Sequence, residues 1–256
     1  AHLQPLNMDF QEAVRKIEER GDFNRFAEVK PFFEEQLKSL GKDDNIERAL
    51  CYYYLLASYL KAQLVHETQE CIEFYEKMDA EFLMQEKLYI KSKKLPLSEM
   101  QDFYQLMERC YSSLEFLYER HNFNIRRNAS YERKMDFRKN SYFYDKKIVS
   151  YLEYRFFELT SNYGVSLVRW AGTTFVFTLI FAIAYWLVDQ FETVRMIAAG
   201  PQNLFDYLYF SIVVTTTVGL GDIVPITEAG KILVATQGFC GFIMLGIFVG
   251  LLQRKF

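Results

Sequence analysis

Two long uncharged stretches near the carboxy-terminus constrain the fold more than any other feature. Residues 170–188 (WAGTTFVFTLIFAIAYWLV) are 19 positions without a charged side chain, and residues 232–253 are 22 more. About 20 apolar residues in a helix span the hydrocarbon core of a bilayer. A pair of buried core helices is the alternative. Two uncharged stretches of this length in one chain, with charged residues only at their ends, favour membrane-spanning helices. We therefore expect two transmembrane helices.

Charged residues are distributed unevenly along the chain. Positions 1–165 contain 25 of the 30 Lys and Arg residues and 28 of the 33 Asp and Glu residues, whereas positions 166–256 contain five of each kind. We therefore expect a water-soluble part followed by a membrane part. Residues 1–19 are amphipathic and charged rather than apolar, so no secretory signal is predicted there. Residues 1–7, which precede Met8, are compatible with a remnant of protein production.

The basic residues next to the two apolar runs predict the orientation in the membrane. Arg169 precedes the first run, and Arg254 and Lys255 follow the second. The loop between them, residues 189–231, has five acidic residues against two basic ones. Lys and Arg are enriched on the cytoplasmic side of membrane proteins. We therefore expect a multi-pass protein of the plasma or inner membrane with both termini in the cytoplasm.

The residue types that support catalysis are sparse and scattered. The four cysteines, Cys51, Cys71, Cys110 and Cys240, show no pairing or metal-type spacing, and a cytoplasmic location requires no disulfide. The three histidines form no metal or nucleophile pattern, and the sequence contains no phosphate-binding loop. We therefore expect neither an enzyme nor a bound cofactor.

A short apolar segment lies between the two long runs. Residues 204–216 (LFDYLYFSIVVTT) are too few to cross a bilayer and too apolar for a loop in water. Pro201, just before this segment, suits the start of a helix. Irregular backbone at membrane depth is tolerated only where it is buried in protein or lines a water-filled path. The pattern predicts a re-entrant helix over 203–216, followed by a returning strand.

The returning segment begins with three threonines and two glycines separated by one residue, TTTVGLGD at 215–222. Desolvated cations need a close cage of oxygens, which rings of backbone carbonyls supply. Pointing successive carbonyls to one side requires backbone of alternating handedness, and glycine adopts positive φ at little steric cost. Gly219 and Gly221 have the spacing for that alternation. Thr217 would add a hydroxyl oxygen at the inner end, and Leu220 would turn its side chain away from the ion.

Seven residues in register resemble the selectivity filter of potassium channels, which is T-V-G-Y-G or T-V-G-F-G followed by Asp. The matching positions are Thr216, Thr217, Val218, Gly219, Leu220, Gly221 and Asp222. The resemblance, to bacterial two-transmembrane pore-loop channels, implies K⁺ as the permeant ion and a filter over 217–221. The implied K⁺ ligands are Thr217, Val218, Gly219 and Leu220. A homotetramer is also implied, because one chain supplies only one of the four strands around such a pore.

The segment departs from the family pattern in three places. Leu220 replaces the usual aromatic residue of the filter. Tyr209 and Phe210 stand where the family carries tryptophans, and Val213 occupies a position that often holds a buried acid. We therefore expect apolar packing in place of the hydrogen-bonded scaffold of the family, and we expect Asp222 to hold the filter further by hydrogen bonding. The residues expected to support the filter are Thr216, Asp222, Val213 and Phe210.

The outer helix is expected over 168–190 and the inner helix over 230–253. Gly241 lies twenty residues after the last glycine of the filter, where the bacterial channels carry a hinge glycine. Glycine costs about 1 kcal/mol relative to alanine within a helix, so its presence suggests either bending or close packing. Both roles of Gly241 stay open. Beyond it, Ile247 or Leu251 is expected to form an apolar inner constriction that gates by dewetting.

Residues 8–130 have helical periodicity and few glycines, which predicts a domain of antiparallel helical hairpins. Helices are expected near 9–20, 23–40, 45–65, 67–92, 97–121 and 129–160. The expected breaks include Gly21-Asp22 and Pro96, with Ser98 as the N-cap of the helix that follows.

Residues 49–78 resemble a tetratricopeptide-type hairpin, although the Gly and Pro markers and a clean 34-residue period are missing. The positions that carry the resemblance are Tyr53, Leu56, Ala57 and Leu60 on the first helix and Cys71, Phe74 and Tyr75 on the second. We expect the Tyr and Phe stripes to form core rather than a ligand cage.

Residues 131–165 mix basic and aromatic side chains in a predicted linker helix. Such a helix either lies along the inner leaflet, with Lys and Arg at anionic headgroups, or is a solvated helix that leads to the membrane. Both interpretations stay open, and membrane lipids are an expected partner. Nucleic acid is not expected, because residues 1–165 have a net charge of −3 and no concentrated basic face.

Together these features predict an all-α protein, in which a cytoplasmic helical-hairpin domain precedes a two-helix transmembrane pore domain at 166–256. The expected function is a tetrameric potassium-selective channel gated through its amino-terminal domain by an unidentified ligand, peptide or protein. Two alternatives stay open. One is a non-selective cation channel, and the other is a membrane-anchored helical binding or scaffold protein.

Overall fold

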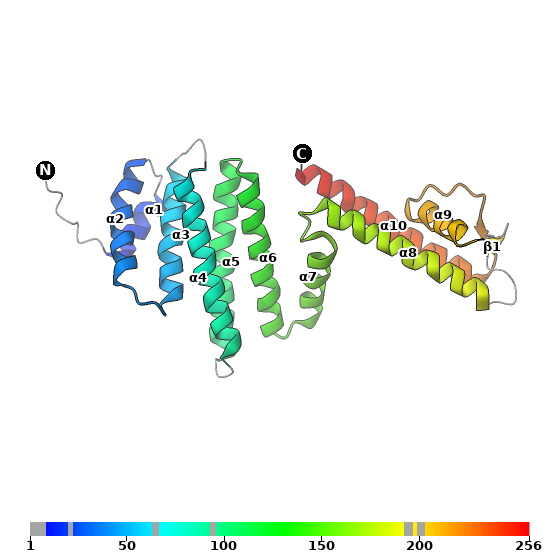
Figure 1. Ribbon diagram of the computed structural model, residues 1–256, viewed down its shortest axis with the longest axis horizontal. Coiled ribbons are helices and arrows are strands. Elements are labelled where there is room, and N and C mark those ends of the chain that lie inside the picture. The colour runs from blue at the N-terminus through cyan, green and yellow to red at the C-terminus, as the bar shows by residue number, and fades with distance from the viewer. Residues whose placement is uncertain are drawn as a thin grey trace. The chain divides into compact units, whose positions relative to one another are not determined.

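The structure is a computed structural model that describes residues 9–19, 23–62, 67–92, 96–191, 197–198 and 203–255. The expected break at Gly21-Asp22, the helix start at Pro201 and the residues before Met8 lie outside the described residues. The chain divides into an amino-terminal unit, residues 1–152, and a carboxy-terminal unit, residues 153–256 (Figure 1).

The amino-terminal unit is a row of antiparallel helices joined by short turns (Figure 1). Its helices are α1 (Phe10–Glu18), α2 (Phe23–Ser39), α3 (Asn45–Lys61), α4 (Gln69–Lys91), α5 (Leu97–Arg120) and α6 (Asn124–Tyr144). Among them α2 packs on α3, α3 on α4, and α5 on α6. The predicted architecture of helical hairpins is confirmed.

Tyrosines on α5 form the centre of this unit. Tyr104, Tyr111 and Tyr118 are spaced by seven residues, which places them on one helix face, and all three are almost fully buried. A buried phenol needs a partner for its hydroxyl. Tyr111 Oη donates to Asp79 Oδ1 at 2.7 Å, and Tyr104 Oη donates to Glu86 Oε1 at 3.0 Å. Acidic side chains of α4 therefore reach the hydroxyls of the aromatic core.

The hairpin of α3 and α4 contains the segment with the tetratricopeptide-type resemblance. Its expected core residues are buried, namely Leu56, Ala57, Leu60, Cys71, Phe74 and Tyr75, and Tyr53 packs against the same cluster. The prediction that the aromatic stripes form core is confirmed for these positions.

Basic residues of α6 pair with acidic residues of the helices beside it. Arg133 Nη2 lies 2.9 Å from Asp79 Oδ2 on α4, and Arg138 Nε donates to Glu108 Oε1 on α5 at 2.8 Å. Lys134 also forms an ion pair with Glu115. The first half of the basic and aromatic segment is therefore engaged within the amino-terminal unit.

Two sequence-based expectations about helix boundaries are wrong. The single helix expected over 129–160 is divided into α6, which ends at Tyr144, and α7 (Ile148–Ser161). Between them Lys146 adopts a positive φ of 57°, and its neighbour Lys147 donates its N–H to the Tyr142 carbonyl at 3.0 Å. This left-handed residue closes α6 without the glycine that usually marks such an end.

The expected N-cap of α5 is also wrong. The helix begins at Leu97, and Pro96 occupies the N-cap position without a side-chain hydrogen bond. The Pro96 carbonyl accepts the N–H of Glu99 at 3.2 Å, so Ser98 already lies inside the first turn.

The carboxy-terminal unit contains two long apolar helices and one short helix between them. Helix α8 (Leu167–Phe191) has 25 residues and α10 (Glu228–Lys255) has 28, against the expected 168–190 and 230–253. At 1.5 Å per residue they are about 38 and 42 Å long. Both are long and apolar enough to cross a bilayer.

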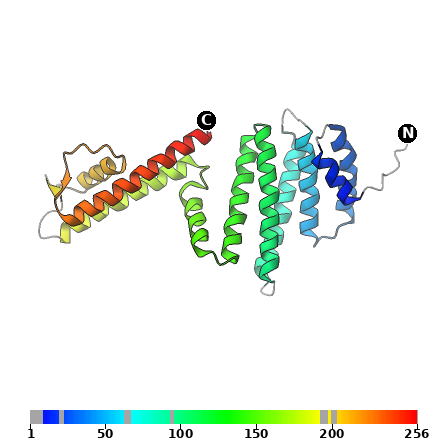
Figure 2. The ribbon, with the colours of Figure 1, turned by 180° about the vertical axis from the view of Figure 1, so that it is seen from behind.

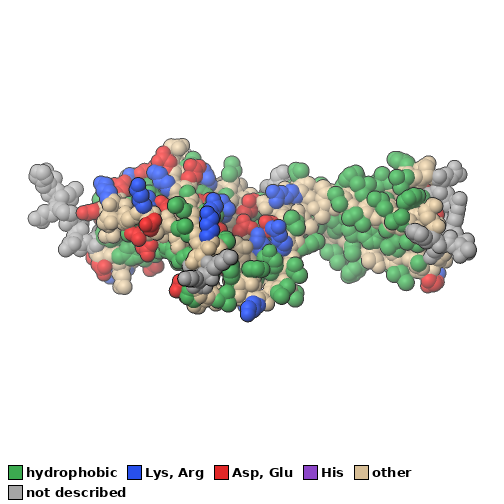
Figure 3. Space-filling view, turned by 60° about the horizontal axis from the view of Figure 1, so that its bottom comes forward, with side chains coloured by type: hydrophobic (Ala, Val, Ile, Leu, Met, Phe, Trp, Pro, Cys, Tyr) green, Lys and Arg blue, Asp and Glu red, His purple; other side chains and the backbone are tan. Residues whose placement is uncertain are grey.

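The short helix α9 (Leu204–Thr215) packs on both long helices, which run antiparallel beside each other (Figures 1 and 2). A two-stranded antiparallel pair joins the connecting segments, with β1 (Ile197–Ala198) opposite β2 (Val224–Pro225). Hydrophobic side chains dominate the surface of this unit in Figure 3, whereas charged side chains gather on the amino-terminal unit. The fold is all-helical apart from this short pair among the described residues.

Burial suppresses the reactivity of the cysteines in the amino-terminal unit. Burial raises the pKa of Cys51 to about 11, and it raises the pKa of Cys71 and Cys110 to about 12. Only the thiolate reacts with alkylating reagents. We expect iodoacetamide at about pH 8 to leave these three thiols unmodified in the native protein and to label them once urea unfolds it. Timed peptide mass spectrometry measures this, and rapid native labelling of Cys71 would contradict the buried placement.

Candidate functional site

The helix α9 starts with a reciprocal cap. Asn203 Oδ1 accepts the N–H of Asp206 at 3.2 Å, and Asp206 Oδ2 accepts the N–H of Asn203 at 3.3 Å. Such a capping box satisfies two of the N–H groups that every helix start leaves open. This pair was not predicted, although an Asn with an Asp three positions later is a start signal that can be read from the sequence.

The chain folds back over the carboxy-terminal end of α9. The N–H groups of Thr216, Thr217 and Val218 donate to the carbonyls of Ile212, Val214 and Val213 at 2.9, 3.0 and 3.2 Å respectively. These bonds satisfy carbonyls at the helix end that otherwise have no partner. They also fix the point at which the glycine-containing segment leaves the helix.

The segment that follows has backbone of alternating handedness. The φ angles of Thr217, Gly219 and Gly221 are 57°, 58° and 79°, whereas Val218 and Leu220 between them are not in the positive region. The positive φ expected at the two glycines is present. Thr217 was not expected to share it, because a β-branched residue with positive φ is a steric outlier. Strained backbone of this kind clusters at functional sites.

The side chains between the left-handed positions are exposed in the single chain. Val218 and Leu220 are each 60 % exposed, although both are apolar. A Cβ added at Gly219 or Gly221 would meet no atom within 4 Å, so the handedness rather than crowding accounts for the glycines there.

A hydrogen bond ties the carboxy-terminal end of this segment to α9. Tyr209 Oη donates to Asp222 Oδ2 at 2.7 Å, and Asp222 Oδ1 accepts the N–H of Ile223 at 3.1 Å. The expected hydrogen bonding by Asp222 is therefore present, whereas the expected apolar packing is wrong at Tyr209, which is the donor. Phe210 and Val213 are apolar and buried, with 4 % and 8 % exposure.

A buried glutamine joins the three helices behind the segment. Gln237 of α10 is fully buried, and its Nε2 donates to Ser211 Oγ at 2.7 Å and to Thr215 Oγ1 at 2.8 Å, both on α9. Tyr185 of α8 donates its hydroxyl to Gln237 Oε1. In the sequence Gln237 stands inside the apolar run 232–253. Polar residues inside spanning helices are costly and usually functional, so this signal was readable.

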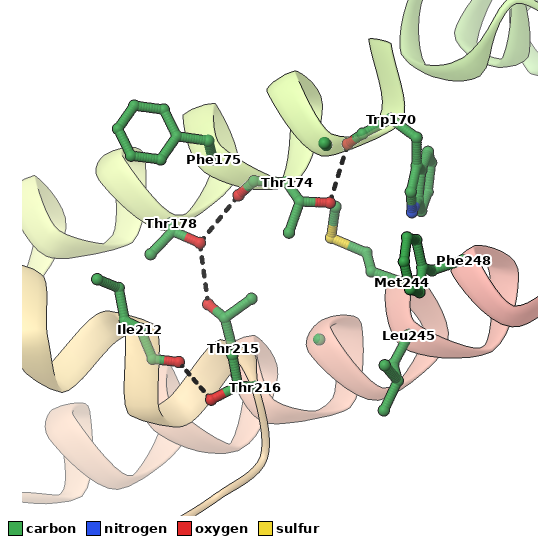
Figure 4. A pocket seen from close by; sticks show the side chains of 12 residues that line it. Trp170, Thr174, Phe175, Thr178, Ile212, Thr215, Thr216, Met244, Leu245 and Phe248 are labelled. Carbon is green, nitrogen blue, oxygen red and sulfur yellow. Dashed lines mark hydrogen bonds between the residues drawn. The ribbon is translucent and has the colours of Figure 1, made fainter. Parts of the chain in front are cut away.

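The network extends from α9 to α8 through hydroxyl groups. Ser211 Oγ donates to the Thr178 carbonyl at 2.7 Å, and Thr178 Oγ1 lies 3.3 Å from Thr215 Oγ1 (Figure 4). Thr178 and Thr215 are 4 % and 5 % exposed. Both spanning helices are therefore hydrogen-bonded to the last turns of α9.

Gly241 packs directly on the end of α9. A Cβ at this position would lie 2.4 Å from the Thr215 carbonyl oxygen, which is closer than real Cβ contacts allow. The absence of a side chain therefore lets the backbone of α10 approach α9. This contact accounts for close packing at Gly241, and the hinge stays a prediction.

The two residues predicted to constrict the inner end have different surroundings. Leu251 is 7 % exposed, and its Cδ2 lies 3.4 Å from the position of a Cβ built on Gly164, in the turn between α7 and α8. Ile247 is half-buried.

Residues 173–256 match a family model described as an ion channel. A "Two pore potassium channel b" of Oryza sativa subsp. japonica is 36 % identical over 73 residues, which are 28 % of this chain and 20 % of that protein. An "Inward rectifier potassium channel Kirbac3.1" of Paramagnetospirillum magnetotacticum is 28 % identical over 99 residues, which are 38 % of this chain and 32 % of that protein. No solved structure matches the chain significantly.

The carboxy-terminal part of the chain is therefore an ion channel pore domain in a membrane protein. Its distant relatives include potassium channels, of which the chain spans about a fifth and about a third. Ion channels conduct ions rather than catalyse reactions, and the prediction that the chain is not an enzyme agrees with this match.

Substitution of Gly241 tests the contact between α10 and α9. We expect Gly241→Ala to destabilise the carboxy-terminal unit by about 1–3 kcal/mol, because the new methyl group overlaps the Thr215 carbonyl. Gly246→Ala is the matched control, since a Cβ there meets nothing within 4 Å and the helix gains about 1 kcal/mol of propensity. Thermal unfolding of both variants in detergent measures the difference. Equal stability would show that the helices do not approach this closely.

Proposed function

We propose that the protein is a potassium-selective channel whose filter is formed by Thr217, Val218, Gly219, Leu220 and Gly221. The alternation of backbone handedness over these residues carries the proposal. Such alternation turns successive carbonyls to one side, where they replace the water shell of a permeating cation. The Thr217 hydroxyl and the carbonyls from Thr217 to Leu220 are the proposed ligands for K⁺.

The proposed channel is a homotetramer. A ring of carbonyls around one axis requires several copies of the same strand, and closed cyclic symmetry is the usual arrangement of identical chains. The exposed side chains of Val218 and Leu220 support this assembly, because apolar groups with 60 % exposure gain stability when neighbouring chains cover them.

The helix α9 favours cations at the inner end of the proposed filter. Helix carboxy-termini carry a partial negative charge of about half an elementary charge. The end of α9 lies directly before Thr217, because its last carbonyls accept the N–H groups of residues 216–218. Asp222 adds a full negative charge at the other end of the segment.

Gating through the amino-terminal domain is proposed from the connection between α7 and α8. Asn162, Tyr163 and Gly164 have φ angles of 51°, 55° and 79°, so the turn is tight and left-handed. Thr173 Oγ1 of α8 donates to the Thr160 carbonyl of α7 at 3.0 Å. Because Leu251 of α10 also contacts this turn, a displacement of α7 would reach both spanning helices. The trigger is a ligand, peptide or protein that binds the amino-terminal domain.

The part of the linker that contacts lipid is proposed to be α7 rather than α6. The basic residues Arg133, Lys134 and Arg138 of α6 are paired with acidic residues of α4 and α5. Helix α7 instead exposes apolar side chains, among them Leu152, Phe156 and Leu159 at 58 %, 57 % and 64 %. Apolar groups on a helix that directly precedes a membrane span fit the interface of the inner leaflet. Both termini are then cytoplasmic in a plasma or inner membrane.

Selectivity tests the filter directly. The full chain in liposomes is expected to carry a K⁺ flux that survives equimolar Na⁺, and Gly219→Ala is expected to abolish this flux or its selectivity. An alanine at a φ of 58° is strained, so the substitution forces the carbonyl out of line.

Gly246→Ala serves as the control for this measurement, because it adds the same methyl group to open space. Retained K⁺ selectivity in Gly219→Ala would argue against the filter. A flux without selectivity in the unmodified chain would indicate a non-selective cation channel, and silence under every gradient would favour a membrane-anchored scaffold.

Removal of the amino-terminal helices tests the proposed gating. A chain that lacks residues 8–147 keeps α7 and the turn to α8 and is expected to change open probability while keeping K⁺ selectivity. Single-channel recording measures both quantities on the same preparation. Unchanged open probability would reduce the amino-terminal domain to a role in assembly.

A further inference from the structure

A cavity of about 480 Å³ lies beneath the carboxy-terminal end of α9 (Figure 4). Helix α8 contributes one wall through Trp170, Ala171, Thr174, Phe175 and Thr178, and α10 contributes the other through Gly241, Met244, Leu245 and Phe248. The roof is formed by Ile212, Thr215 and Thr216. A volume of this size is in the range that accommodates small-molecule ligands, about 300–1,000 Å³.

The hydroxyl groups in the cavity are already engaged by the protein. Thr174 Oγ1 donates to the Trp170 carbonyl at 3.0 Å, and Thr178 Oγ1 donates to the Thr174 carbonyl at 2.9 Å (Figure 4). Thr216 Oγ1 donates to the Ile212 carbonyl at 2.8 Å, and Thr215 Oγ1 accepts from Gln237 at 2.8 Å. The threonines therefore present their methyl groups as well as bonded hydroxyls to the space between the helices.

The remaining lining is apolar, and none of the described residues that line the cavity is charged. A polar solute would lose its hydrogen bonds to water on entry without gaining equivalent partners. A hydrocarbon chain has no hydrogen bonds to lose, and the flexible thioether of Met244 adapts readily to its shape. The lining therefore selects an apolar occupant.

The surroundings of the cavity supply such an occupant. Its walls belong to the two membrane-spanning helices, and the large side chains at its rim, Phe175, Leu245 and Phe248, are 58 %, 48 % and 38 % exposed. Residues of spanning helices that are exposed in this way meet the hydrocarbon of the bilayer unless another chain covers them. The bilayer hydrocarbon next to the opening of the cavity is therefore apolar, like the residues that line the cavity.

We propose that the cavity is a binding site for one acyl chain of a membrane lipid. The seated chain contacts Thr215 and Thr216 at the base of the proposed filter and lies against α10 next to Gly241. Its presence fills the space into which the end of α9 and the inner helix would otherwise collapse. The binding site does not depend on ion selectivity, because it requires only that α8 and α10 span a membrane.

The two tryptophans of the chain provide a direct measurement. Trp170 lines the cavity and is 2 % exposed, whereas Trp186 is 39 % exposed on α8 and is not among the lining residues. The full chain with Trp186→Phe has Trp170 as its only tryptophan, which is excited selectively at wavelengths where tyrosine does not absorb. It is reconstituted into vesicles of phosphatidylcholine with brominated acyl chains, since bromine quenches tryptophan at close range.

We expect strong quenching of Trp170 relative to vesicles of unbrominated lipid, with the largest effect for one bromine position along the chain. Ala171→Leu, which adds a side chain to the wall, is expected to reduce this quenching several-fold. Ala235→Leu is the matched control, because Ala235 is exposed on α10 outside the cavity, and it is expected to leave the quenching unchanged.

Leu245→Ala gives a second, independent test in the opposite direction. This substitution widens the cavity, so quenching of Trp170 is expected to persist or increase even where Ala171→Leu fails to assemble. Unquenched Trp170 in the parent and in Leu245→Ala would overturn the proposal and indicate that a neighbouring copy of the chain covers the cavity. Equal loss of quenching in Ala171→Leu and Ala235→Leu would also overturn it. Ion flux is not part of the measurement, so failure of the proposed selectivity leaves these outcomes interpretable.

Discussion

The hydrogen bonds of the Gln237 amide are the interactions on which the geometry of the pore domain depends. Helices in a bilayer gain little from hydrophobic burial against one another, so hydrogen bonds and close packing hold them together. Gln237 supplies both donors and an acceptor inside that environment, and it bonds Ser211 and Thr215 of α9 and Tyr185 of α8. Each partner is buried, so breaking one bond would leave an unpaired polar group in a medium without water. The network therefore fixes the end of α9 against both spanning helices.

The strained segment after α9 persists because both of its ends are held. A β-branched residue in the left-handed region costs of order 1–3 kcal/mol, and Thr217 adopts this conformation beside two glycines that share its handedness. The amino-terminal end is bonded to the last carbonyls of α9, whose position Gln237 sets. The carboxy-terminal end is held by the bond between Tyr209 and Asp222. A segment of five residues between two such anchors cannot relax without breaking one of them.

The sequence predicted those parts of the site that follow from local conformational preference. Two glycines separated by one residue have few uses other than alternating handedness, so Gly219 and Gly221 were interpretable without a structure. The Tyr209–Asp222 bond and the Gln237 network were missed because they join residues 13 and more positions apart, and only tertiary packing sets which polar groups meet. The end of α6 at Tyr144 was not predicted either, because no local sequence signal marks it. Lys146 takes the left-handed conformation without glycine, and the paired basic residues of α6 hold that helix in place.

Thr215 is the point at which the parts of the pore domain meet. Its hydroxyl accepts from Gln237, its carbonyl lies against Gly241, and its side chain forms part of the roof of the cavity. It is also two residues from Thr217, where the alternating backbone begins. A movement of α10 at Gly241 therefore cannot leave the base of the segment unchanged, because the carbonyl of Thr215 has no room to give way. The same contact that excludes a side chain at Gly241 makes the inner helix and the proposed filter mechanically dependent on each other.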